Sequence, residues 1–247
     1  MRNREMFKQI AETFSQLPAN YVLLEEPVNI EVQNQYVDFV QKERVKVDEQ
    51  EALANIPKLE KWDGTPEDLK MYLSQLAIIE KVEAYRALER FVKDTGHSLF
   101  DWAILALQES RMLLRSQFLD EHQVYVSSAL GGRGQKLRYF LVMLHDRFDH
   151  FSEFEQKVFR NEMLSRLEDI DAEIEEVNFN HCFVTISLLL PIIANLEYTF
   201  NSGIDECNEY GNFLSEDLIL TNMKKIPDEE IIEMVDELKD RLKQLPE

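Results

Sequence analysis

The chain is poor in the residues that cross-link or punctuate a polypeptide. Its 247 residues include two cysteines, seven glycines and seven prolines. Cys182 and Cys207 are too few for a disulfide framework or a cysteine-based zinc site, so we expect both to be buried thiols. The longest apolar stretch, residues 182–194, contains hydroxyl side chains and a proline and is too short to span a bilayer. The sequence therefore predicts neither a disulfide-rich nor a membrane protein.

Positive charge is also scarce. The chain has 27 Lys and Arg against 47 Asp and Glu, a formal charge of −20. Residues 167–223 contain no Lys or Arg, and this acidic block invites a cation, a basic partner or the chain's own basic loop. Such an excess of acid repels nucleic acid and anionic membranes, so the sequence disfavours both as partners. The charged N-terminus lacks a secretory signal, which predicts a cytoplasmic location.

The order of apolar patterns predicts an α+β fold. We expect a mostly helical chain with a small, mainly antiparallel sheet of ββαβαβα order in the C-terminal half, preceded by a helical-hairpin subdomain. The chain is expected to divide into an N-terminal helix and irregular arm over residues 1–64, a helical subdomain over 65–119 and an α+β domain over 120–247. Strands are expected over residues 124–130, 137–144, 179–190 and 217–221, the first two forming an antiparallel pair.

Helix starts have clear signals. Helices are expected over residues 3–16 and 192–208, after the capping side chains Thr65, Ser98 and Ser152, and after Pro227. The pairing of residues 81–93 with 100–115 resembles one helical hairpin of an α-solenoid such as a HEAT repeat. Because such arrays need at least about three repeats, an ordinary helical subdomain is the first interpretation and a protein-docking solenoid fragment the second.

Three of the seven glycines lie within four residues, beside three cations and no acid. This loop supplies the candidate anion-binding residues Gly131, Gly132, Arg133, Gly134, Lys136 and Arg138. Glycine lets backbone N–H groups approach a ligand, and cations favour an anionic one. The spacing matches neither the Walker motif nor the dinucleotide fingerprint. The alternative is a flexible hairpin turn whose cations balance the acidic block.

The same segment, LGGRGQKLRYF over residues 130–140, resembles an LGG-x-G-x-KLRYF string in uncharacterised bacterial proteins. The resemblance covers about fifteen residues and implies no activity.

Two histidines follow the expected second strand, in the run His145-Asp146-Arg147-Phe148-Asp149-His150. His145 and His150 are weak acid/base candidates, and a polar connection between a strand and a helix is the favoured explanation of this run. Their spacing matches no established metal signature. The run from Asp169 to Asn180 begins like an EF-hand loop but lacks its glycine and final glutamate. The sequence therefore predicts no metal, no cofactor and no catalytic residue pair.

These observations favour a non-catalytic intracellular interaction or adaptor protein that binds a protein partner, or a second copy of itself, through residues 131–138 and an acidic surface. The alternative is an enzyme or sensor that binds a phosphorylated small molecule at the same loop, with His145 or His150 as acid/base. That alternative requires the loop and one histidine to converge. A third hypothesis is an acidic decoy that occupies a basic partner through residues 167–223.

Overall fold

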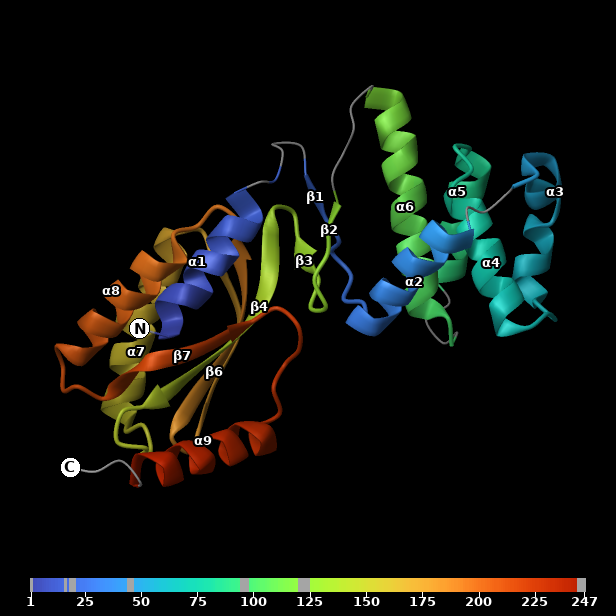
Figure 1. The fold of residues 1–247 in the computed structure, drawn as a ribbon. Helices are drawn as coiled ribbons and strands as arrows, with labels where there is room; N and C mark the ends of the chain where they lie inside the picture. Colours follow the sequence, from blue (N-terminus) through green and yellow to red (C-terminus); the bar gives the residue numbers. More distant parts are fainter. Residues whose placement is uncertain are drawn as a thin grey trace. The chain divides into compact units, whose positions relative to one another are not determined.

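The computed structural model describes residues 2–15, 17, 21–43, 47–93, 98–119 and 125–243 (Figure 1). The chain forms two compact units. We call Met1–Leu17 with Gly132–Glu247 the sheet unit, and Pro18–Gly131 the helical unit. These bounds differ from the expected divisions after residues 64 and 119, because contacts join the N-terminal helix to the C-terminal sheet and the arm to the helical subdomain.

The sheet unit is built on five strands, all paired antiparallel. They are β3 (Gly132–Arg133), β4 (Lys136–His145), β5 (Glu173–Asn180), β6 (Phe183–Pro191) and β7 (Leu214–Thr221). Their order across the sheet is β5-β6-β4-β7, and the short β3 pairs with the start of β4. Helix α7 (Glu153–Asp169) links β4 to β5, and α8 (Leu196–Asn208) links β6 to β7. Each link passes over one intervening strand, which makes two interleaved split βαβ units and confirms the α+β expectation.

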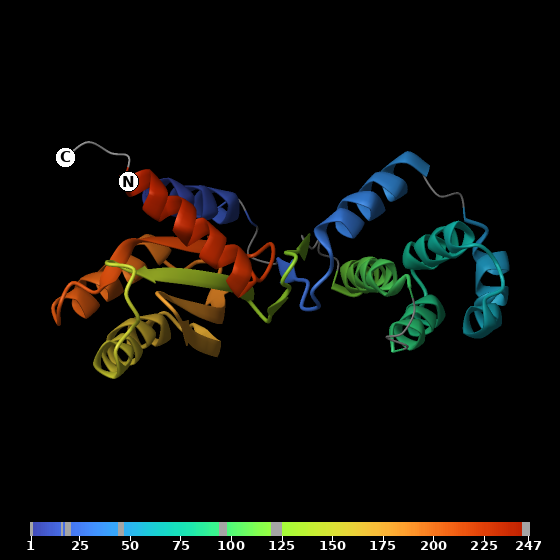
Figure 2. The same cartoon turned by 90° about the horizontal axis from the view of Figure 1, so that it is seen from below.

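Helices cover both faces of this sheet. Figure 2 shows α7 and α9 (Asp228–Lys243) on opposite sides of it. Every residue of β6 from 183 to 190 is buried, as a strand covered on both faces requires. Helix α1 (Arg2–Ser15) packs beside α8, where Phe7 stacks on Phe200 with ring centroids 5.6 Å apart. The N-terminal helix thus completes a core formed by the C-terminal half.

Two strand predictions are wrong in detail. Within the expected strand over residues 124–130, the described segment Tyr125–Val126 (β2) pairs parallel with Val22–Leu23 (β1), and β3 takes the place beside β4. The single strand expected over residues 179–190 is a hairpin of β5 and β6, turned at His181, whose φ of 47° is left-handed. The order is therefore ββαββαβα. The turn residue is a histidine, so the sequence has no glycine at this point to indicate that the chain reverses.

The helical unit packs around α4 (Pro66–Ala77), α5 (Val82–Val92) and α6 (Phe100–Leu119). Leu73, Leu76, Leu88 and Ala103 are fully buried at its centre. Against this core lie α2 (Ile30–Glu43), α3 (Glu49–Ala54) and the 3-10 helix η1 (Ile56–Lys61), which form much of the segment that the sequence left irregular. The run Asp94-Thr95-Gly96, whose glycine predicts the end of a helix, lies outside the described residues.

Both helix starts that carry a complete capping box are confirmed. At the start of α4 the Thr65 hydroxyl accepts a hydrogen bond from the Asp68 N–H, and the Asp68 carboxylate accepts one from the Thr65 N–H. Ser152 and Glu155 make the same two bonds at the start of α7. These caps satisfy backbone donors that a helix start leaves free. Local signals thus fixed the starts of one helix in each unit.

Candidate functional site

The glycine-rich segment has backbone reasons for its glycines. A Cβ on Gly131, whose φ is +70°, would lie 2.3 Å from the carbonyl oxygen of Glu25. On Gly132 it would lie 2.5 Å from the carbonyl oxygen of Lys136, across the hairpin of β3 and β4. Gly134 has a φ of +61° in the turn of that hairpin. Chain geometry therefore accounts for these residues without a ligand.

The cations of the loop meet carboxylates of their own chain. Arg133 forms an ion pair with Glu173. Lys136 Nζ lies 2.9 Å from Glu173 Oε1 and 3.0 Å from Asp171 Oδ2. Glu173 thus connects the two residues that flank the β3–β4 turn to the start of β5.

A second set of ion pairs continues along the same face. Arg138 donates from Nε and from a terminal nitrogen to the two carboxylate oxygens of Glu175, at 2.7 and 2.9 Å. Lys225, in the connection from β7 to α9, lies 3.3 Å from Glu176. We call the set of Arg133, Lys136, Arg138, Lys225, Asp171, Glu173, Glu175 and Glu176 the charged face.

Strand register shows which side of the sheet carries the charged face. Phe159 of α7 contacts Phe179, with ring centroids 5.5 Å apart, so Phe179 and its partner Val184 face α7. Side chains alternate along a strand, so Ser187 and Leu189 point to the opposite side. Arg138 pairs with Leu189 and Glu176 with Ser187, which places the charged face on the α9 side.

The ion pairs keep the charged face ionised. The hydrogen bond from Lys136 lowers the pKa of Glu173, and the one from Arg138 lowers that of Glu175. Hydrogen bonds from Asn178 and Lys225 lower the pKa of Glu176. All three carboxylates are therefore charged at neutral pH.

Of the three partners expected for the acidic block, the structure shows the chain's own basic loop in contact with it. Sequence reasoning named the loop cations and placed Asp171, Glu173, Glu175 and Glu176 in the acidic block. It missed Lys225, because nothing near that residue in the sequence signals a place beside β5.

The two histidine candidates lie at the other end of β4. Lys136 starts that strand and His145 ends it, nine residue steps or roughly 30 Å away. His145 is 1% exposed, its Nδ1 accepts the Arg147 N–H at 3.2 Å, and its Nε2 lies 3.5 Å from Glu155. His150 is exposed, and its ring lies 5.7 Å from that of His181. The convergence of loop and histidine that the enzyme or sensor alternative requires is absent.

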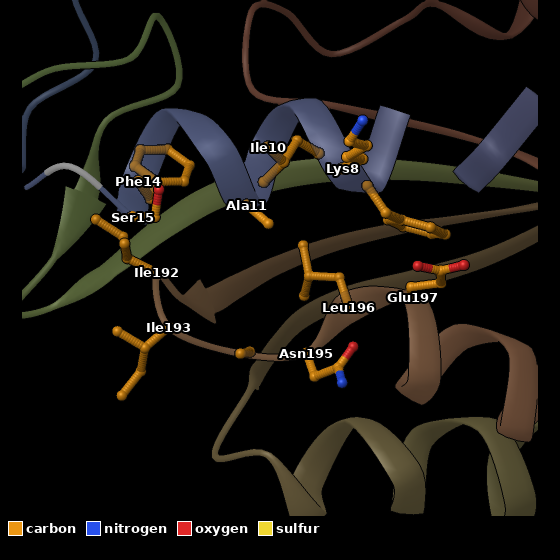
Figure 3. Close-up of a pocket in the computed structure, with 12 residues that line it drawn as sticks. Lys8, Ile10, Ala11, Phe14, Ser15, Ile192, Ile193, Asn195, Leu196 and Glu197 are labelled. Atoms are coloured by element: carbon orange, nitrogen blue, oxygen red, sulfur yellow. The ribbon is translucent and has the colours of Figure 1, made fainter. Parts of the chain in front are cut away.

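A shallow apolar groove lies between α1 and the connection from β6 to α8 (Figure 3). Its volume is about 510 Å³, and Ile10 and Phe14 line one side and Ile192 and Leu196 the other. Ile193 at its edge is 90% exposed. The groove can accept an apolar group, and Lys8 and Glu197 also line it.

The helical unit contains a buried polar pair of a different kind. The Tyr36 hydroxyl donates to Glu109 Oε2 at 2.5 Å between α2 and α6. Burial raises the pKa of Tyr36 well above its usual value, and the Glu109 charge raises it further. Burial also raises the pKa of Glu109, although the hydrogen bond from Tyr36 opposes that shift. The pair is a fixed internal contact between two helices.

Within the residues that the structure describes, no group of three or more His, Cys, Asp or Glu side chains could hold a metal ion. Among the same residues, no helix combines the length and the apolar composition needed to cross a membrane. Both cysteines are free and buried, as expected.

Comparisons with known proteins return structures only. No protein-family model and no curated protein matches the chain. A crystal structure of a proposed transposase from Deinococcus radiodurans R1 is similar at 10% identity, covering 44% of this chain and 93% of that one, with a TM-score of 0.33. A REP-associated tyrosine transposase bound to a REP hairpin is similar at 12% identity, covering 41% of this chain and 63% of that one, with a TM-score of 0.31.

These findings correct two expectations. One matched structure is of a proposed transposase and the other of a transposase bound to a REP hairpin, and these findings stand against the expected adaptor function and against the expectation that nucleic acid is disfavoured as a partner. The likeness is too low to assign either protein's activity to this chain. The geometry bears on the other expectations for the loop: Arg133, Lys136 and Arg138, the expected partner contact, are engaged by carboxylates of β5 and its preceding turn. The histidines lie at the other end of β4, which counts against the enzyme or sensor alternative.

Proposed function

We propose that the charged face of the sheet unit binds the phosphate backbone of a nucleic acid, and we place this activity in the cytoplasm. One observation carries the proposal: cations from two separate segments gather on one side of the sheet in a chain of charge −20. Arg133, Lys136 and Arg138 come from the β3–β4 hairpin and Lys225 from the connection before α9. Arg133, Arg138 and Lys225 all lower the pKa of the one carboxyl group of Glu175, so their charges lie close together.

Two of these cations are held in position without a ligand. The side chains of Lys136 and Arg138 are 14% and 22% exposed, so their stems pack on the sheet while their charged ends reach the surface. Side chains that are already ordered lose less conformational entropy when they bind. The Arg138 guanidinium grips Glu175 through two parallel hydrogen bonds, a geometry that also fits two phosphate oxygens.

The carboxylates that occupy these cations can be exchanged. Solvent-exposed ion pairs contribute little to stability because water and salt screen them. A nucleic acid brings several phosphates at once and releases its condensed counterions when cations neutralise them. We therefore expect binding that is independent of base sequence and weakens steeply with salt.

The experiment compares the wild type with Lys136→Gln/Arg138→Gln. Fluorescence anisotropy would follow binding of a labelled 20-nucleotide DNA strand, and of its duplex, between 50 and 200 mM NaCl. Loss of two phosphate contacts should weaken binding about tenfold and reduce the slope of log K against log salt by about 1.5 to 2. A rise in anisotropy that is equal for the wild type and the variant would contradict the proposal.

A matched control tests whether the effect is local. Lys58→Gln/Lys61→Gln in η1 of the helical unit also removes two positive charges, but from exposed positions outside the charged face. This control should bind as the wild type does. Thermal melting of all three proteins would establish that each is folded.

A further inference from the structure

We infer that the start of strand β5, with the turn before it, is a built-in competitor of the nucleic acid: its carboxylates hold the cations of the charged face and must be displaced before phosphates bind. The inference rests on the function proposed above and adds its regulation. Asp171, Glu173, Glu175 and Glu176 lie within six consecutive residues, and each contacts at least one of the four cations. Four negative groups from one short segment thus oppose four positive ones.

An irregularity in β5 makes this match possible. The register of β5 against β6 shifts between Ile174 and Glu176, as in a β-bulge. In a regular strand, Glu175 and Glu176 would point to opposite faces. With the bulge, Glu175 reaches Arg138 while Glu176 reaches Lys225. Bulges redirect side chains at sheet edges, and this one delivers two adjacent carboxylates to the same set of cations.

The carboxylates use the donors that phosphates would need. Glu175 takes both parallel donors of Arg138, and Glu173 takes donors of Arg133 and Lys136. These acids come from an edge strand, so they can turn away from the cations without opening the core.

The test uses Glu173→Gln/Glu175→Gln in the full chain, with the DNA strand and duplex as probes. We expect about tenfold tighter binding than wild type at 50 mM NaCl and a steeper dependence on salt, because fewer carboxylates compete with phosphate. Glu80→Gln/Glu83→Gln, at exposed positions of the helical unit, changes the net charge equally and should leave binding at the wild-type level. Thermal melting confirms that both variants are folded.

The outcomes separate the inference from the proposed function. If the wild type binds and Lys136→Gln/Arg138→Gln weakens it, but Glu173→Gln/Glu175→Gln binds no more tightly, the competitor is overturned and the binding face stands. If the wild type does not bind the DNA and the Glu173→Gln/Glu175→Gln protein does, the competitor is supported in its strongest form. If neither protein binds the DNA, the binding face is overturned, and the competitor with it.

Discussion

In the sheet unit carboxylates pair with cations at the protein surface, whereas in the helical unit a carboxyl group pairs with a hydroxyl in the protein interior. Glu173 and Glu175 lie on an exposed edge strand and hold Lys and Arg side chains there. Glu109 is enclosed between two helices and accepts a hydrogen bond from Tyr36. An exposed pair can exchange partners at little cost, while a buried one is costly to break because it leaves a polar group unsatisfied. A carboxyl group can thus form an exchangeable contact in one unit and a fixed packing contact in the other.

The largest effect is expected at Gly131 of the helical unit, where the backbone of Glu25 leaves no room for a Cβ. Gly131→Ala places a Cβ 2.3 Å from the Glu25 carbonyl oxygen at a φ of +70°, and should cost about 2 to 4 kcal/mol of unfolding free energy. Gly134→Ala in the sheet unit has a similar φ of +61° but no atom within 4 Å, and should cost only about 1 kcal/mol. Urea unfolding followed by circular dichroism measures both. Equal losses would show that the Glu25 contact contributes nothing.

The next effect tests the buried pair itself. Tyr36→Phe removes the hydroxyl that donates to Glu109 and leaves a largely buried carboxyl group without that donor. We expect a loss of about 1 to 3 kcal/mol, again from urea unfolding. Arg138→Gln is the comparison from the sheet unit, where water can replace the lost partner, and its loss should be the smaller of the two. The reverse ranking would remove the distinction between fixed and exchangeable pairs.

A smaller effect is expected at the two capping boxes, where the units are built alike. Thr65→Ala in the helical unit and Ser152→Ala in the sheet unit each remove a side chain that accepts a backbone N–H. Each should cost about 1 kcal/mol of unfolding free energy. Thr65→Ser and Ser152→Thr keep the hydroxyl and should restore most of that loss. Failure of the conservative replacements to do so would mean that packing, not capping, decides these positions.

These caps also show which parts of the fold the sequence could predict. Thr65 and Ser152 were predictable because a helix start is a local event, decided within about four residues. Strand β5 was missed because its Glu-Ile-Glu-Glu start contains the bulge, which breaks the alternation that identifies a strand. The third strand was therefore expected as one piece where the chain forms a hairpin.

The candidate site shows the same limit. Its cations were named from composition, but the partner of Arg133 lies 40 residues away along the chain, and no local pattern selects it. Charge balance alone suggested that the loop and the acidic block could meet. Which acid meets which cation depends on strand register, which the sequence did not determine.

The smallest expected effect is a change in pH dependence rather than in overall stability. Burial raises the pKa of Glu109 and the Tyr36 hydrogen bond opposes that shift, so the net rise is a difference between two effects. With a folded pKa above the unfolded one, the native state holds its proton longer as pH rises. The wild type therefore loses stability between the unfolded pKa, near 4.5, and the folded pKa. The Gln side chain of Glu109→Gln cannot titrate, so the unfolding free energy of this variant should increase relative to that of the wild type as pH rises from 4 to 7.

Glu89 supplies a control of opposite sign. A hydrogen bond from Arg86 lowers the pKa of Glu89, so the wild type gains stability above the unfolded pKa and loses it as pH falls through the folded one. As pH rises over the same range, the unfolding free energy of Glu89→Gln should therefore decrease relative to that of the wild type. This decrease should be smaller than the relative increase for Glu109→Gln, because the Glu89 pair is exposed to solvent. Urea unfolding at pH 4, 5.5 and 7 measures both variants. If the unfolding free energy of Glu109→Gln also decreased relative to the wild type as pH rises, the effect of the Tyr36 hydrogen bond on the Glu109 pKa would outweigh that of burial. The Glu109 carboxyl group would then be stabilised as an ion, as the carboxyl groups of the charged face are.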